Sequence, residues 1–139
     1  MKKLLLIGLS VLMLNISAKP MKTTMEKPYT ILVLMNATPQ WLSLSRDKRA
    51  VFFEKEVMPI FMKVGETIEV RLFDSEYFHS TVSDFMIIEA QNLHDYQELI
   101  ERLRDTKIYA EPYFEIKDII LGQQNRFEDF NAQFKDEQP

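Results

Sequence analysis

The sequence contains no cysteine, so disulfide bonds, thiol nucleophiles and thiolate metal sites are all excluded. Glycine is almost as scarce, since only Gly65 and Gly122 lie outside the apolar N-terminal segment. Dinucleotide-binding fingerprints, phosphate-binding P-loops and the nucleophile elbow of α/β-hydrolases all need closely spaced glycines. The H-E-x-x-H motif of metalloproteases is absent as well. Several common nucleotide-binding and hydrolytic mechanisms are therefore excluded.

Basic residues are outnumbered, with 17 lysines and arginines against 21 aspartates and glutamates. Lys2 and Lys3 fall in the N-terminal segment, so a chain without residues 1–18 has a formal net charge of 15 − 21 = −6. An acidic domain without a basic cluster is a poor candidate for binding nucleic acid or an anionic membrane. We therefore expect no nucleic-acid partner, and no membrane association of the mature form.

The first 18 residues have the pattern of a secretory signal peptide. Two lysines precede an apolar run over residues 4–14, and Ala18 is a small residue at the expected cleavage position. The apolar run is too short to span a bilayer, which takes about 20 residues. We expect residues 1–18 to be the signal peptide, 19–28 a flexible lead-in, 29–134 a single α+β domain and 135–139 a frayed tail. The mature protein would be periplasmic or secreted.

Hydropathy patterns predict strands over residues 29–35, 67–74, 84–89 and 113–121. Helices are predicted over 46–63 and 92–104, with Ser45 and Asn92 as N-caps. Pro59 should kink or shorten the first helix. The apolar stripe of that helix is expected to comprise Ala50, Phe53, Val57, Ile60 and Phe61.

This order of elements predicts a ferredoxin-like βαββαβ fold, a four-stranded antiparallel sheet with both helices on one face. The segments 29–35 and 84–89 are apolar on both alternating faces, so the other face of the sheet also needs a cover. A second copy of the chain would give a homodimer of the dimeric α/β-barrel kind. Alternatively, a short C-terminal helix bearing Phe127, Phe130 and Phe134 could fold across that face.

The connection between the second and third strands carries Asp74, Glu76, His79 and Asp84. Their spacing matches no metal-ligand rule, so we expect no bound metal. His79 could act as a general acid or base, because its ordinary pKa lies near neutrality. A polar loop between two strands is the simpler interpretation, and we favour it.

Aromatic residues gather at predicted strand ends and loops, where they could line a pocket for a small molecule. Core and interface packing is the simpler explanation of these aromatic residues, and we favour it. The candidate pocket residues are Trp41, Phe73, Tyr77, Tyr109 and Tyr113.

Three segments of the chain, 29–52, 71–106 and 111–120, resemble the darcynin family. The run N-A-T-P-x-W-L-x-L-S-R over residues 36–46 and the acidic connection after residue 71 are the most specific parts. The family is small and bacterial, without an assigned activity, so the resemblance supports the fold and supplies no catalytic residues. More remotely, the pattern is similar to the dimeric α/β-barrel superfamily, which includes cofactor-independent monooxygenases, small isomerases and haem enzymes.

Three hypotheses follow from these patterns. The first is an exported, dimeric module that binds a small apolar or aromatic molecule without a cofactor. The second is a small monooxygenase- or isomerase-like enzyme with His79 as the proton-transfer group and Arg71 or Tyr113 orienting an oxyanion. The third is a structural protein without a ligand.

The signal-peptide interpretation predicts cleavage near Ala18, which would leave 139 − 18 = 121 residues. Intact-mass measurement on protein recovered from the periplasm or medium should show the shortened chain. A chain that still begins at Met1 and stays in the cytoplasm would contradict this prediction.

Overall fold

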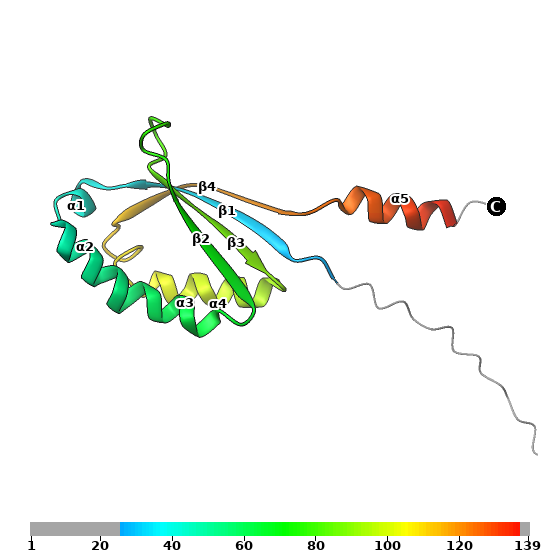
Figure 1. Cartoon of the computed structure of the whole chain (residues 1–139), viewed down its shortest axis with the longest axis horizontal. Helices are drawn as coiled ribbons and strands as arrows, with labels where there is room; N and C mark the ends of the chain where they lie inside the picture. The colour runs from blue at the N-terminus through cyan, green and yellow to red at the C-terminus, as the bar shows by residue number, and fades with distance from the viewer. Residues whose placement is uncertain (1–25, 137–139) are drawn as a thin grey trace, which may run out of the picture.

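The computed structural model describes residues 26–136 and places four strands in one antiparallel sheet (Figure 1). The predicted signal peptide and most of the lead-in lie outside the described residues. The order of strands across the sheet is β2-β3-β1-β4, with β1 and β3 in the centre. This arrangement confirms the predicted α+β, ferredoxin-like class. The strands are β1 (Tyr29–Ala37), β2 (Ile68–Asp74), β3 (Asp84–Ala90) and β4 (Phe114–Gln123).

The helices between the strands cover one face of the sheet, as predicted (Figure 1). One continuous helical segment follows β1, and α4 follows β3. Ser45 and Asn92 are N-caps as expected, since their side chains accept the backbone N–H groups of Lys48 and Asp95. A short helix before this segment, α1, was not predicted. The helices are α1 (Pro39–Leu42), α2 (Arg46–Phe52), η1 (Phe53–Val57), α3 (Met58–Val64) and α4 (Leu93–Arg104).

A π-helical turn, η1, directly precedes the segment with Pro59, where the helix was predicted to kink or shorten. The N–H of Met58 donates to the carbonyl of Phe53, one residue further back than in an α-helix. The turn adds a residue and shifts the apolar stripe. Phe52 is therefore buried, and the expected stripe residue Ala50 is exposed.

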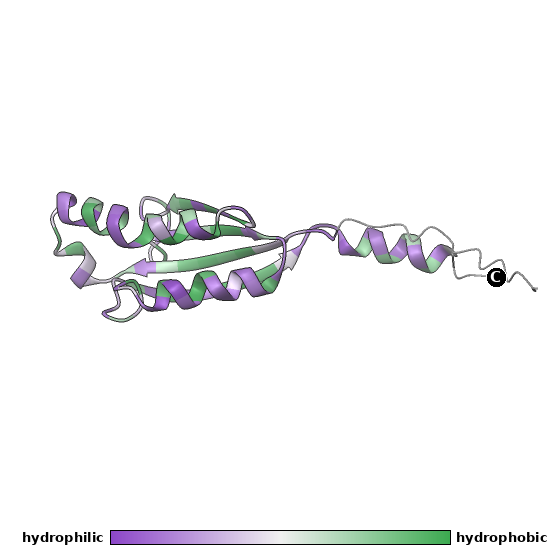
Figure 2. Ribbon diagram, turned by 90° about the horizontal axis from the view of Figure 1, so that it is seen from below, coloured by the Kyte–Doolittle hydropathy of each residue, from purple (hydrophilic) through white to green (hydrophobic). Residues whose placement is uncertain are grey.

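The core lies between the sheet and the helices. Strand residues alternate, so that Ile31 and Val33 of β1 and Ile88 of β3 point toward the helices and are fully buried. They meet Leu99 and Leu103 of α4, which are equally inaccessible to solvent. Figure 2 shows the strands coloured largely as hydrophobic, whereas the helices alternate between hydrophobic and hydrophilic residues. The amphipathic helices thus supply one apolar side to the core.

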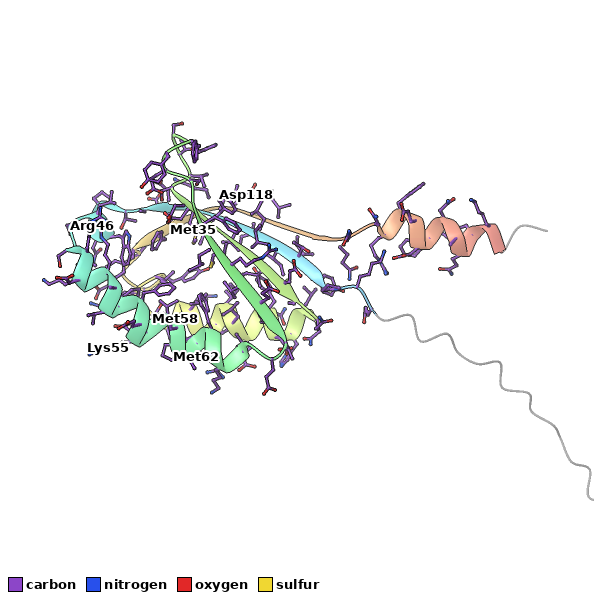
Figure 3. The ribbon with its side chains drawn as sticks, in the orientation of Figure 1. Met35, Arg46, Lys55, Met58, Met62 and Asp118 are labelled. Carbon is purple, nitrogen blue, oxygen red and sulfur yellow. The ribbon has the colours of Figure 1, made fainter. Side chains whose placement is uncertain are left out.

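The opposite face of the sheet, which we call the open face, has no helix over it (Figure 1). Leu32 lies between Ile87 and Ile120 in the strand register, and Leu34 lies beside Phe85. In Figure 3, Met35 and Asp118 mark the helix-covered side and the open side of the sheet. The apolar residues of the open face are Leu32, Leu34, Phe73, Phe85, Ile87 and Ile120.

The C-terminal helix α5 (Arg126–Asp136) extends beyond the end of the sheet and does not cover the open face (Figure 1). Lys27 holds its first turn through an ion pair of 2.9 Å with Asp129. Phe127 is 80% exposed on this helix. The helix includes two residues of the predicted frayed tail, and residues 137–139 lie outside the described part. Within residues 26–136, no helix combines the length and apolar character needed to span a bilayer.

Candidate functional site

A cavity of about 360 Å³ lies between the sheet and the helices, on the covered side. It is formed where β1 and β2 end and where β3 and β4 begin, with α1, α2, η1 and α3 as its other wall. Leu42 and Leu72 line it and remain 57% and 47% exposed, so they mark its opening to solvent. The remaining apolar lining residues are Met35, Ala37, Trp41, Phe52, Phe53, Val57, Phe61, Met86, Ile108 and Phe114. Phe73 and Phe85 also border the cavity at the strand ends, although strand alternation directs their side chains to the open face.

Aromatic rings form much of the helical wall of the cavity. Trp41 is positioned by α1, whose N-cap residue Thr38 also donates its hydroxyl to the carbonyl of Pro112 at 2.8 Å. The Trp41 ring lies 5.9 Å from the ring of Phe52 and 5.2 Å from that of Phe114. Close aromatic pairs of this kind hold one another in place, so the wall is preformed.

Three carboxylates, Asp74, Glu76 and Asp84, line the cavity, and we call them the acidic rim. Oxygen atoms of the three groups lie within 4.8 Å of one another. Strand register brings two of them together, because Asp74 of β2 is paired with Asp84 of β3. The hydroxyl of Ser83 donates to the carboxylate of Asp84 and accepts the N–H of Ala37 at 2.7 Å. Backbone pairing therefore fixes like charges side by side.

Burial raises the pKa of Asp84 above its ordinary value of 3.8, and the charges of Glu76 and Asp74 raise it further. The hydrogen bond from Ser83 acts in the opposite direction and lowers that pKa. Among the ion pairs formed by residues 26–136, none involves the acidic rim. The repulsion within the rim is thus unrelieved by any basic side chain of the described chain.

The acidic rim alone offers an incomplete site for a metal ion. Hard divalent cations take six or more oxygen ligands, or keep several waters. Asp74 and Glu76 are exposed, and three carboxylates supply only part of such a shell. The geometry therefore favours no particular ion.

His79 lies in the loop between β2 and β3 and does not line the cavity. Its ring is exposed, and Nδ1 accepts the backbone N–H groups of Thr81 at 3.2 Å and Val82 at 3.0 Å. Nδ1 is therefore an acceptor, which leaves Nε2 to carry the hydrogen of the neutral ring. The histidine stabilises the shape of its own loop.

The other proposed catalytic residues lie elsewhere. Arg71 is on the open face, where it bridges Glu89 at 3.0 Å and Glu69 at 3.6 Å. Tyr113 is buried on the covered side, with its ring 5.3 Å from Trp41. The structure therefore does not bring Arg71, Tyr113 and His79 to one site.

Of the predicted pocket residues, Trp41 lines the cavity, and Phe73 borders it only at the end of β2, where its side chain belongs to the open face. Tyr113 packs behind Trp41, and Tyr77 is 77% exposed at the tip of the loop. Tyr109 is partly buried beside α4, and burial raises its pKa. The prediction missed the lining residues of the helical segment and of the strand interiors. Their apolar periodicity was visible, but it does not distinguish a cavity wall from a filled core.

Comparison with known sequences identifies one family. The model of darcynin, a domain of unknown function, matches residues 17–133. A darcynin homolog from Streptomyces avermitilis is 33% identical over 102 residues, which cover 73% of this chain and 84% of the relative.

Comparison with solved structures identifies the fold. A haem-binding protein from Thermus thermophilus superposes with a TM-score of 0.67 at 14% identity, over 79% of this chain and 45% of that one. A mutant chlorite dismutase from Candidatus Nitrospira defluvii gives a TM-score of 0.64 at 19% identity, over 78% of this chain and 44% of the other. This chain thus spans less than half the length of these structures. At such identities the likeness shows the shared fold alone.

The raised pKa of Asp84 predicts a pH-dependent stability penalty. The folded state binds the proton more tightly than the unfolded state, so ionisation of Asp84 costs stability at neutral pH. This cost disappears as the pH falls through the raised pKa toward 3.8. Asp84→Asn should therefore raise the free energy of unfolding at pH 7, and the gain should shrink as the solution is acidified.

Urea unfolding of both proteins across this pH range measures the effect. Glu66→Gln, at an exposed turn residue outside the acidic rim, is the control and should show no comparable gain. A variant at Asp84 that is less stable than the parent at pH 7 would contradict the account.

Proposed function

This chain belongs to the darcynin family, a domain of unknown function, and from its own geometry we propose that it is an exported, dimeric binding module. Its ligand is a small apolar or aromatic molecule held in the cavity between the sheet and the helices. The observation that carries the proposal is the cavity itself, about 360 Å³ in volume, with an aromatic wall and an opening to solvent. Small-molecule sites are typically concave, mostly apolar and preformed.

The positions of the predicted catalytic residues do not support the enzyme hypothesis. A general acid or base must lie within hydrogen-bond reach of its substrate. His79 lies outside the cavity, and its Nδ1 already accepts two backbone hydrogen bonds. Arg71 is engaged on the open face. The positions of His79 and Arg71 therefore give the enzyme hypothesis no support.

Haem is a candidate ligand because one protein with this fold is described as haem-binding. Haem iron is held by histidine, cysteine, tyrosine or methionine paired with histidine. The described lining includes Met35 and Met86 but neither histidine, cysteine nor tyrosine. The donor set does not fit haem, so the proposed ligand is an organic molecule without a metal.

The open face supports the dimeric part of the proposal. Phe73 and Phe85 stack at 4.7 Å between centroids, and Leu32 and Leu34 continue the apolar surface across β1. Burying one such side chain contributes about 1.5–3 kcal/mol. The C-terminal helix lies elsewhere, so a second copy of the same face is the simplest cover. Arg71, paired with Glu69 and Glu89, forms a polar edge of this apolar surface on the side of β2.

Occupation of the cavity can be followed with Trp41, the only tryptophan in the chain. The neutral aromatic dye N-phenylnaphthylamine should bind saturably and change the fluorescence of Trp41. Ala37→Phe adds a ring at a cavity-lining position and should weaken dye binding about tenfold or more, which corresponds to about 1.4 kcal/mol. Ala50→Phe makes the same change on the exposed side of α2 and should leave binding unchanged. Equal binding by both variants and the parent would contradict the cavity as the site.

The dimer can be tested by light scattering on the mature protein at micromolar concentration. The parent should have the mass of two chains, and Ile87→Lys on the open face should reduce it to one. Val51→Lys, at an exposed residue of α2, should not alter the mass. A parent mass near one chain that is unchanged by dilution would rule out the dimer.

A further inference from the structure

The cavity is apolar within and acidic at one side of its boundary. Buried Met35, Val57 and Met86 supply apolar surface to its interior. The acidic rim, by contrast, comprises two exposed carboxylates and the half-buried Asp84. A ligand that fills the cavity therefore meets apolar groups along its body and carboxylates at one end.

The negative charge of the acidic rim exceeds the positive charge on the rest of the cavity lining. Among the lining residues that belong to the described range 26–136, Arg49 is the only basic one. Its guanidinium donates to the carbonyl of Leu42 at 2.8 Å and lies over the ring of Trp41, 5.7 Å from the centroid. The lining thus contains three carboxylates and one guanidinium, and the guanidinium lies on the helical wall. The lining has a net charge of 1 − 3 = −2 when all four groups are ionised.

Three features of the rim make it attractive to a cation. Strand pairing and the Ser83 hydrogen bond keep the like charges together. The adjoining apolar surface lowers the local dielectric constant, so charges at this boundary interact more strongly than in bulk solvent. The aromatic wall adds ring faces, which also attract cations.

We infer that the cavity takes a molecule with an apolar or aromatic body and a protonated amine, whose ammonium group lies at Asp74, Glu76 and Asp84. This inference rests on the proposed binding function and adds the charge of the ligand to it. An ammonium group carries three donors, enough to reach all three carboxylates. The ammonium would relieve the repulsion within the rim, while the body of the ligand fills the apolar interior.

Three probes of similar size separate the contribution of charge from that of the apolar body. Phenethylamine is cationic at neutral pH, phenethyl alcohol is neutral, and phenylpropionate is anionic. Each probe is titrated into the mature dimer, and binding is measured by calorimetry and by Trp41 fluorescence. The amine should bind at least about tenfold more tightly than the alcohol. The anion should bind more weakly than either.

The preference for the amine should depend on the acidic rim. Asp74→Asn combined with Glu76→Gln neutralises the two exposed carboxylates without changing the size of the side chains. This double variant should lose most of the amine's advantage and still bind the alcohol with parent affinity. Glu54→Gln combined with Glu66→Gln removes two exposed charges outside the cavity and is the matched control. It should retain the full advantage of the amine.

Each other outcome overturns a defined part of the account. Equal affinity for all three probes would overturn the charge inference and leave the cavity as an apolar binding site. Tighter binding of the anion would show that Arg49, rather than the rim, selects the ligand. If calcium or manganese chloride alone bound to the rim while the amine did not, the rim would be a site for an inorganic cation. Failure of all three probes and of the neutral dye would overturn the binding function itself.

Discussion

The architecture depends on a central strand that is apolar on both faces. In β1, Ile31 and Val33 are fully buried against the helices, while Leu32 and Leu34 point to the open face. Two helical segments are enough to cover only one side of a four-stranded sheet. The covered side supplies the core and the cavity. The open side leaves an apolar surface for which the chain itself, within residues 26–136, provides no cover.

Much of the fold could be predicted from periodicity and capping residues. Continuous apolar runs and, in the second strand, alternating hydropathy located the strands, and Ser45 and Asn92 located the starts of two helices. The π-helical turn could not be predicted in this way, because it depends on which ring, that of Phe52 or Phe53, packs more deeply on the sheet. In the structure Phe52 is the buried ring, and the π-helical turn places one extra residue between Phe52 and the next buried residue, Val57.

The candidate site was harder to predict, because it draws on all four strands and several helices. The sequence shows Asp74, Glu76, His79 and Asp84 close together, and it gives no means of separating the histidine from the carboxylates. The register of β2 against β3 brings Asp74 beside Asp84. The loop then turns His79 toward its own backbone. Such a register depends on which side chains face the core, and hydropathy alone leaves the long connection undetermined.

Repulsion among the clustered carboxylates lowers the stability of the folded state, and the cavity lacks the packing contacts that a filled core would have. Arrangements that violate local rules in this way are expected at functional sites, where binding or catalysis compensates for them. Both features lie at the same end of the sheet, which is the main reason for assigning them to one site. Within residues 26–136, a conventional ferredoxin-like core is thus combined with an unfilled cavity that three carboxylates border.

The central claim is that a small aromatic molecule enters the cavity on the helix-covered side, and methionine methyl NMR tests it most directly. Met35 and Met86 are buried in the cavity wall, whereas Met58 and Met62 lie on the outer surface of α3 and do not line it. With isotope-labelled methionine methyl groups, saturating phenethyl alcohol should shift the Met35 and Met86 signals and give nuclear Overhauser effects to both. The Met58 and Met62 signals should stay in place. Shifts confined to Met58 and Met62, with Met35 and Met86 unchanged, would contradict the account.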